Sequence, residues 1–221
     1  MYKNIAFIPV RGGSKSIPSK NIKKLNGKPL VYWTVKAAHD AQLIDHIYVS
    51  TDSFKIKAVV ESFGFHDVTV VDRSHQNASD TASTESAMLE FANQSFEFEN
   101  IVLIQATSPL LKSTDLDAGI GLFEETTADS LISVVRKKQF IWKDADGIAE
   151  ATYDYKNRPR RQEYNGYLVE NGAFYITRKN LLLETECRIS GVIRYYEMNE
   201  NSIFEIDEPA DWKIMESIMK F

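Results

Sequence analysis

The residues best suited to chemistry lie in one segment near the amino terminus, which reads Arg11-Gly-Gly-Ser-Lys-Ser-Ile-Pro-Ser-Lys-Asn21. Gly12 and Gly13 allow backbone N–H groups to approach an anion closely. Arg11 offers a planar fork for phosphate oxygens, and Lys20 offers a mobile point charge. A triphosphate carries about four negative charges, which must be neutralised if a diphosphate is to leave. The segment therefore predicts a polyphosphate site, with a flexible cationic loop as the alternative.

The distribution of charge also indicates a site for a small polyanion. The chain carries 26 Lys and Arg against 31 Asp and Glu, a net charge of −5, which disfavours a general nucleic-acid-binding function. Residues 1–39 nevertheless contain eight cations and no anion, because the first acidic residue is Asp40. The remaining 182 residues contain 18 cations and 31 anions. A cationic start on an acidic chain favours a confined anion site over a nucleic-acid surface.

Composition disfavours several other classes of protein. The 43% share of apolar residues suits a globular domain. The single cysteine, Cys187, cannot form an internal disulfide, so we expect a reducing compartment and a cytoplasmic location. The apolar run at residues 5–10 is too short for a signal peptide. No apolar run approaches the roughly 20 residues that a membrane span needs, so we expect no membrane partner.

Other common site motifs are missing from the sequence. No G-x-G-x-x-G follows the first apolar run, which leaves a dinucleotide site of that type unsupported, and there is no G-x-x-x-x-G-K-[ST]. The histidines are His39, His46, His66 and His75. None of them is spaced with another histidine or with the cysteine as in a typical zinc site. We therefore expect ordinary surface or helix-end histidines.

The elements that must position the cationic segment alternate between strands and helices. Short apolar runs predict strands at residues 5–10, 47–50, 68–71, 101–105, 131–135, 172–176 and 192–196. Apolar residues at helical spacing predict helices at residues 29–41, 56–63, 84–94 and 209–219. A further helix is expected to follow a cap at Ser113 or Thr114 and to run to about Glu125. This alternation predicts a three-layer α/β domain with a mainly parallel sheet. The loops after the carboxyl ends of the strands then share one edge, where α/β proteins bind ligands.

One part of the chain breaks this alternation. Residues 137–167 interleave aromatic and basic side chains. Their composition suits an arm or hairpin that covers the site or contacts a second subunit, and it suits a solvated loop equally well. We expect a single domain over residues 1–221 with an inserted arm at about residues 137–170.

The cationic segment and six further segments resemble the CMP-sialic acid synthetases, also called acylneuraminate cytidylyltransferases. In chain order they are Ile8-Pro-Val-Arg-Gly-Gly-Ser-Lys-Ser-Ile-Pro-Ser-Lys-Asn21, Val49-Ser-Thr-Asp52, Ala78-Ser-Asp-Thr-Ala-Ser83, Gln105-Ala-Thr-Ser-Pro-Leu110, Arg160-Arg-Gln162, Asn171-Gly-Ala-Phe-Tyr-Ile176 and Ile206-Asp207. Each segment alone is weak. Together, in the family's order and at compatible spacing over nearly the whole chain, they are highly specific.

The resemblance implies a Rossmann-like nucleotidyltransferase domain with a protruding dimerisation arm, and hence a homodimer. It also implies transfer of CMP from CTP to the anomeric hydroxyl of a nine-carbon 2-keto sugar acid, which is sialic acid or a related nonulosonic acid, with release of pyrophosphate. The family's nucleotide site corresponds to Arg11, Gly12, Gly13, Lys20, Asn21, Arg73 and Ser83. Its sugar site corresponds to Gln105, Thr107, Ser108, Arg161 and Gln162.

The resemblance further implies a metal site near the carboxyl terminus. Asp207 matches the family's metal-binding aspartate, and Glu205 stands where the family tends to have a second aspartate. In an extended segment, residues i and i+2 project to the same face and could share one ion. Mg²⁺, or another divalent cation, prefers such oxygen ligands. We expect Arg11, Lys20 and Asp207 to be the catalytic residues, while the general base stays open between a metal-bound hydroxide and a carboxylate.

Several functions are compatible with these motifs. A cytidylyltransferase for an eight-carbon octulosonic acid would differ mainly in the sugar site, which is the least transferable part of the resemblance. A non-catalytic nucleotide-binding module could retain the fold, and a related transferase could use UTP or GTP. The presence of Arg11, Lys20 and Asp207 favours an active enzyme, because loss of activity would remove such residues first.

Overall fold

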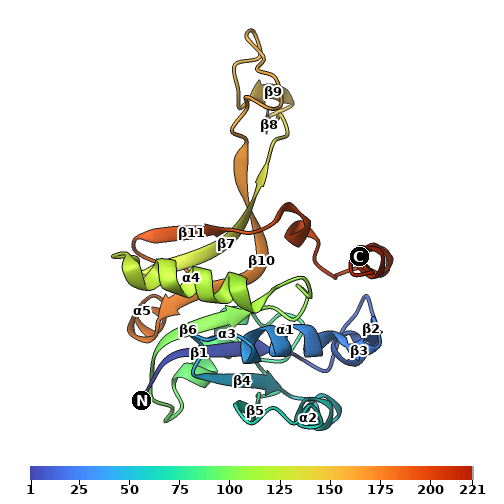
Figure 1. Ribbon diagram of the computed structural model, residues 1–221, viewed down its shortest axis with the longest axis vertical. Coiled ribbons are helices and arrows are strands. Elements are labelled where there is room, and N and C mark those ends of the chain that lie inside the picture. The colour runs from blue at the N-terminus through green and yellow to red at the C-terminus, as the bar shows by residue number, and fades with distance from the viewer. Residues whose placement is uncertain (221) are drawn as a thin grey trace.

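The computed structural model describes residues 1–220 and centres on a seven-stranded sheet (Figure 1). The strands are β1 (Tyr2–Pro9), β4 (His46–Thr51), β5 (Val68–Asp72), β6 (Phe98–Ile104), β7 (Ser130–Lys137), β10 (Tyr167–Arg178) and β11 (Ile193–Glu197). Their spatial order is β11-β7-β10-β6-β1-β4-β5. Among these described strands, β10 runs antiparallel to β6 and β7, and all other neighbours are parallel. The expected α/β fold with a mainly parallel sheet is thus confirmed.

Helices cover the two faces of this sheet. They are α1 (Leu30–His39), α2 (Phe54–Glu61), α3 (Thr84–Ala92), α4 (Ser113–Glu125), α5 (Lys179–Thr185) and α6 (Pro209–Ile218), with short 3-10 helices η1 (Lys20–Ile22) and η2 (Glu200–Ile203). Two small hairpins are β2 (Lys24–Leu25) with β3 (Lys28–Pro29), and β8 (Trp142–Ala145) with β9 (Ile148–Ala151). The pattern predicts α4, but the residue that caps it is Lys112 and not Ser113 or Thr114. It misses α5 and the β2–β3 hairpin, which are too short to show a period. Within residues 1–220, no helix combines the length and the apolar character that crossing a bilayer requires.

Both faces of the sheet are buried, because successive residues of a strand point to opposite sides. In β1, Ala6 and Ile8 belong to the cluster formed with α1, α2 and α4. Ile5 and Phe7 belong to the opposite cluster, formed with α3 and α5. All four side chains are fully buried. The resulting arrangement has three layers, and it explains why β1 reads as a continuous apolar run.

A third, smaller cluster holds α6 against the cationic segment. Trp212 and Met215 of α6 pack with Ile17. Ile206, in the segment before α6, joins the same cluster and is fully buried. This packing brings the end of the chain next to residues 11–21, from which it is separated by most of the sequence.

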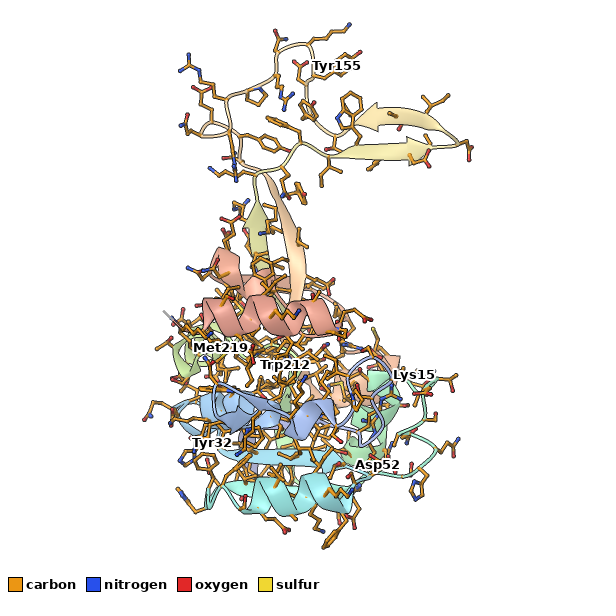
Figure 2. All side chains as sticks on the ribbon, turned by 90° about the vertical axis from the view of Figure 1, so that its right-hand side faces the viewer. Lys15, Tyr32, Asp52, Tyr155, Trp212 and Met219 are labelled. Carbon is orange, nitrogen blue, oxygen red and sulfur yellow. The ribbon has the colours of Figure 1, made fainter. Side chains whose placement is uncertain are left out.

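Strands β7 and β10 extend beyond the body and carry the arm, defined here as residues 138–166 (Figure 1). The Phe140 ring lies 4.5 Å from the Tyr153 ring and 4.9 Å from the Tyr164 ring, measured between centroids. The guanidinium carbon of Arg158 lies 4.2 Å from the centroid of Phe140. The arm thus has a small aromatic cluster of its own, and Figure 2 shows it standing away from Lys15 and Asp52 on the body.

Candidate functional site

A pocket of about 240 Å³ lies at the edge of the sheet where β1, β5 and β6 end. Its walls come from the cationic segment, the segment between β5 and α3, and the loop after β6. They are formed by Pro9, Arg11, Lys20, Asn21, Arg73, Asp80, Ala82, Thr84, Gln105, Ala106 and Thr107. Six of the expected site residues are therefore brought together, although they are spread over nearly a hundred positions of the sequence.

The cationic segment is fastened to the sheet by side chains and by close packing. The Gly12 N–H donates to Asp52 Oδ1 at 2.8 Å, and Asn21 Nδ2 donates to the Arg11 carbonyl at 3.0 Å. A Cβ at Gly12 would lie 2.9 Å from the Ser53 Cβ, so only glycine allows this approach to the start of α2. The Gly12 amide is thus engaged by Asp52 in this structure, whereas Gly13 is exposed and has open space around it.

Two cations of the segment meet a single carboxylate, that of Asp80. Arg11 Nη1 lies 2.7 Å from Asp80 Oδ1, and Lys15 Nζ lies 2.9 Å from Asp80 Oδ2. Hydrogen bonds from Lys15 and Arg11 hold the pKa of Asp80 below its ordinary value. Asp80 is absent from the residues predicted for the site, although the motif Ala78-Ser-Asp-Thr-Ala-Ser83 contains it. In the structure it is the counter-charge of the expected polyphosphate site.

Lys20 connects the cationic segment to the segment before α6. Its Nζ donates to the Ile206 carbonyl at 2.9 Å and to Asp207 Oδ1 at 3.1 Å. The side chain of Lys20 is only 13% exposed, whereas that of Asp207 is 66% exposed. The Ser16 hydroxyl also donates to the Asp207 carbonyl, and the Ile206 N–H donates to the Thr107 carbonyl at 2.9 Å. The ammonium group is therefore held rigidly at the pocket, beside the aspartate expected to bind a metal.

Glu205 lies over a glycine of β10. Gly172 has a φ of +64°, and a Cβ there would lie 2.5 Å from Glu205 Oε1. Burial raises the pKa of Glu205 to about 7, with a further contribution from the charge of Asp207 and an opposing one from Lys20. Two carboxylates close enough to repel each other form an oxygen donor set that suits Mg²⁺. Glu205 and Asp207 therefore fit a divalent cation.

Arg73 follows β5 and presents its guanidinium group at the pocket wall. Burial lowers its pKa, and its Nη2 donates to the Asn77 carbonyl. Glu90 of α3 holds the same turn through the Ser74 N–H at 3.0 Å and Asn77 Nδ2 at 2.9 Å. The buried Arg73 Nε has no hydrogen-bond partner within residues 1–220, so it is a donor suited to a bound ligand.

The residues expected at the sugar site fall into two groups. Gln105 and Thr107 line the pocket after β6. Ser108 is buried just behind them, and its Oγ and the Thr107 Oγ1 lack hydrogen-bond partners in the described part of the chain. Arg161 and Gln162 are exposed on the arm and do not line the pocket. One chain therefore brings together only three of the five residues predicted for the sugar site.

Ser83 has a structural role in this arrangement. Its Oγ accepts from the Ser86 N–H at 3.0 Å, which caps the amino terminus of α3. Its neighbours Ala82 and Thr84 line the pocket. The expected contact of Ser83 with the nucleotide stays a prediction.

Residues 5–221 match the family model described as Cytidylyltransferase. The chain belongs to the cytidylyltransferase family. It is 37% identical over 222 residues to N-acylneuraminate cytidylyltransferase A of Danio rerio, covering 98% of this chain and 51% of that protein. It is 38% identical over 223 residues to N-acylneuraminate cytidylyltransferase of Oncorhynchus mykiss, covering 98% and 50%. The chain thus spans about half the length of these curated relatives, and they confirm the resemblance seen in its motifs.

Solved structures share the fold. CMP:2-keto-3-deoxy-manno-octonic acid synthetase complexed with CTP aligns with a TM-score of 0.73 at 17% identity, covering 99% of this chain and 98% of that chain. 4-Diphosphocytidyl-2C-methyl-D-erythritol synthase from Anaerococcus prevotii DSM 20548 aligns with a TM-score of 0.74 at 12% identity, covering 100% and 97%. At such low identity the likeness concerns the α/β architecture alone.

Proposed function

We propose that this chain transfers CMP from CTP to the anomeric hydroxyl of a nine-carbon 2-keto sugar acid. The hydroxyl oxygen bonds to the α-phosphorus, the bond between the α-phosphorus and the bridging oxygen breaks, and pyrophosphate leaves with that oxygen while the hydroxyl proton is lost. The observation that carries the proposal is the pocket at the strand edge, which Arg11 and Lys20 line and beside which Lys20 pairs with Asp207. The relatives named N-acylneuraminate cytidylyltransferase support the choice of CTP and of a nonulosonic acid.

The cations of the pocket are suited to the polyphosphate. Arg11 offers two parallel N–H donors, and the nearly buried Lys20 offers a fixed positive charge. Both would bind phosphate oxygens and stabilise the charge that develops as pyrophosphate leaves. Asn21 and Arg73 line the same pocket and would contact the nucleotide. Triphosphate binding then replaces the ion pairs of Arg11 and Lys15 with Asp80.

We infer that Asp207 and Glu205 hold a divalent cation such as Mg²⁺. Bound there, the cation would neutralise phosphate oxygens during the transfer. Its charge would also favour the ionised form of Glu205, whose pKa is raised by burial and, to a smaller extent, by the charge of Asp207. For Asp207→Asn we expect a magnesium requirement at least about tenfold higher, measured as the Mg²⁺ concentration giving half-maximal rate. An unchanged requirement would remove Asp207 from the metal site.

We further propose that the enzyme works as a homodimer. Gln105, Thr107 and Ser108 lie at or just behind the pocket, whereas Arg161 and Gln162 lie on the arm. The sugar site is completed if the arm of one protomer reaches the pocket of the other. The exposed aromatic side chains of the arm suit such a contact.

An octulosonic acid is the second candidate substrate, because an octonic acid synthetase has the same fold with a TM-score of 0.73. The deciding experiment incubates the purified chain with CTP, Mg²⁺ and one acid at a time: N-acetylneuraminic, legionaminic, pseudaminic and octulosonic acid. We expect pyrophosphate and a CMP-sugar of the correct mass with a nine-carbon acid. A faster reaction with the eight-carbon acid would make octulosonic acid the preferred candidate substrate. CTP binding without turnover would indicate a binding module, and faster turnover with UTP or GTP would indicate another transferase.

The cytoplasm is the location that we propose for this reaction. Cys187 is exposed and free, which suits a reducing compartment. Fractionation of source cells should place the protein in the soluble cytoplasmic fraction. Recovery in a secreted or membrane fraction would contradict this assignment.

A further inference from the structure

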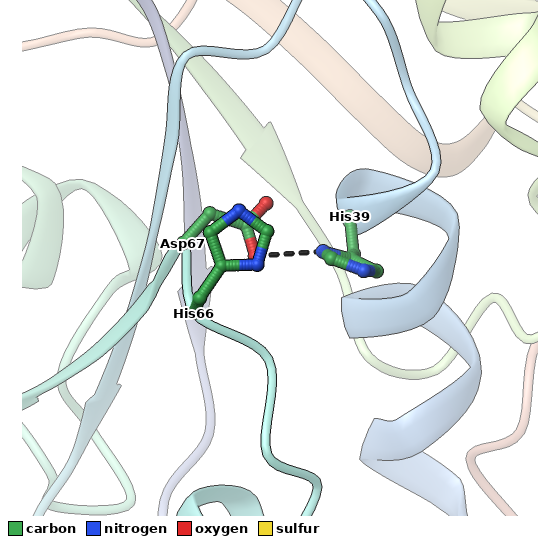
Figure 3. Close-up of side chains that lie close together, drawn as sticks. All are labelled: His39, His66 and Asp67. Atoms are coloured by element: carbon green, nitrogen blue, oxygen red, sulfur yellow. Dashed lines mark hydrogen bonds and ion pairs between the residues drawn. The ribbon is translucent and has the colours of Figure 1, made fainter.

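A compact group of metal-ligating side chains lies far from the pocket. The pocket lies at the carboxyl ends of the strands, and this group lies at the opposite ends. It consists of His39, His66 and Asp67, whose potential ligand atoms all lie within 4.8 Å of one another (Figure 3). His39 is the last residue of α1, and Asp67 directly precedes β5. The pocket, in contrast, lies where β1, β5 and β6 end.

The fold itself holds two of these side chains in place. The His39 ring stacks on Phe65 with 4.2 Å between centroids, and His39 Nδ1 lies 2.7 Å from Asp67 Oδ1. The Asp67 carbonyl accepts from the Ile47 N–H at 2.9 Å, which fixes this residue to β4. The side chains of His39 and Asp67 are only 24% and 19% exposed. His66 is exposed and free to adjust its rotamer, so the group combines a rigid pair with one adaptable ligand.

The donor set selects a class of metal. Two imidazole nitrogens and one carboxylate oxygen suit zinc and similar transition metals, whereas Mg²⁺ and Ca²⁺ prefer oxygen ligands alone. Zinc bonds to such donors are about 2.0–2.2 Å long, which places tetrahedral ligand atoms about 3.3 Å apart. Bringing the present atoms to that spacing requires shifts of about 1 Å, within reach of side-chain rotation. Three protein ligands leave a fourth position for water or a further donor.

We propose that His39, His66 and Asp67 form a binding site for one divalent transition metal, with Zn²⁺ as the best match. The metal would join the end of α1 to the start of β5, two segments that are linked in sequence only through β4 and α2. Because the site lies at the amino ends of the strands, away from the pocket, its proposed role is to stabilise the fold and not to carry out chemistry. A ligand that binds only the native state raises its stability by mass action.

The test uses the full chain, stripped of metal with EDTA and dialysed. Zinc chloride should bind in a ratio of one per chain by elemental analysis. At a hundredfold excess over Kd it should raise Tm by about 5–10 °C. In His66→Ala both effects should be lost, and this exposed position tolerates alanine without disturbing the core. Mg²⁺ should change Tm equally in the wild type and in His66→Ala.

Two control variants separate the site from adventitious binding. His75→Ala removes an exposed histidine outside the group, and Cys187→Ser removes the exposed thiol. Both should retain the zinc-dependent rise in Tm. An equal rise in His66→Ala, or its loss in Cys187→Ser, would overturn the proposal, as would the absence of bound zinc in the wild type.

Discussion

The pocket edge and the arm differ in whether their charged side chains form ion pairs within the chain. At the pocket edge, Arg11 and Lys15 pair with Asp80, and Lys20 pairs with Asp207. In contrast, no residue of the arm (residues 138–166) takes part in any of the ion pairs found within residues 1–220. The arm also exposes large apolar surfaces, with Trp142 48% and Ile148 69% exposed.

This difference indicates which kind of partner each region can bind. At the pocket edge, three of the cations already pair with carboxylates of the same chain. Under the proposed function, a polyphosphate therefore competes with Asp80 and Asp207 for these cations. The basic side chains of the arm form no ion pairs within the described residues, and Trp142 and Ile148 are largely exposed, which favours a contact with another molecule. Under the proposed function, the first region supplies the nucleotide site and the second completes the sugar site of a partner.

The largest expected effect concerns Lys20, whose side chain at the pocket is only 13% exposed. Lys20→Ala should lower kcat by about 100-fold or more, because it removes a positive charge that stabilises the departing pyrophosphate. Steady-state kinetics with saturating CTP measure this effect. Lys24→Ala, at an exposed position of β2 outside the pocket, should leave kcat unchanged. A variant Lys20→Ala that raises only the KM for CTP would restrict this residue to ground-state binding.

The second effect concerns the arm. Arg161→Ala should raise the KM for the sugar acid by at least about tenfold, the loss expected for a hydrogen bond to a charged group, and leave the Kd for CTP unchanged. The exposed Lys156→Ala serves as control on the same arm. A weaker affinity for CTP in Arg161→Ala would contradict the division between the two regions.

Mixing two impaired chains sharpens this test. In a dimer of Lys20→Ala with Arg161→Ala, one pocket keeps Lys20 and receives Arg161 from the other protomer. At a sugar-acid concentration below the wild-type KM, where each variant alone is nearly inactive, subunit exchange should restore about a quarter of wild-type activity. No recovery despite demonstrated exchange would show that the arm serves its own chain or neither site.

The third effect exploits the burial of Glu205 beside Asp207 at the pocket edge. Because folding raises the pKa of Glu205 to about 7 from 4.5, the unfolded chain releases this proton first, and the native state loses stability as pH rises between about 4.5 and 7. Without metal, Glu205→Gln should therefore be more stable than the wild type by about 1–2 kcal/mol at pH 8, after allowance for partial solvent screening. The gain should shrink towards pH 5. Urea unfolding in EDTA measures both values.

The control for that experiment lies on the arm. Glu150 is exposed in β9, so Glu150→Gln should change stability little at either pH. A loss of stability in Glu205→Gln at both pH values would show that the carboxylate contributes more to packing against Gly172 than its charge costs.

The smallest expected effect concerns the exposed counter-charge. Asp80→Asn frees Arg11 and Lys15, so the Kd for CTP measured by calorimetry should fall by about two- to fivefold, in line with the modest value of exposed ion pairs. Asp146→Asn, in the β8–β9 turn, should leave it unchanged. Weaker binding in Asp80→Asn would mean that this carboxylate holds Arg11 in its binding position.

The alternation of elements was predictable because it depends on local burial. Ile5 to Ile8 read as a buried strand since the side chains of β1 face helices on both sides. The residues of α4 predict a helix that the structure confirms, although it begins one or two residues earlier, after Lys112. The same reasoning misses the full length of β10, because its first residues, Tyr167 to Glu170, leave the body and form the base of the arm.

The sequence predicted which residues carry charge near the site, but it did not predict which of them pair with each other. By itself, the sequence determined an α/β fold, a cationic loop after the first strand and the match to a cytidylyltransferase family. Only the tertiary structure decided that Lys20 pairs with Asp207, that Arg11 pairs with Asp80, and that two histidines of no regular spacing meet at Asp67. Periodic burial is a property of neighbours along the chain. Contacts between distant charges depend instead on the order of the strands and on where α6 packs.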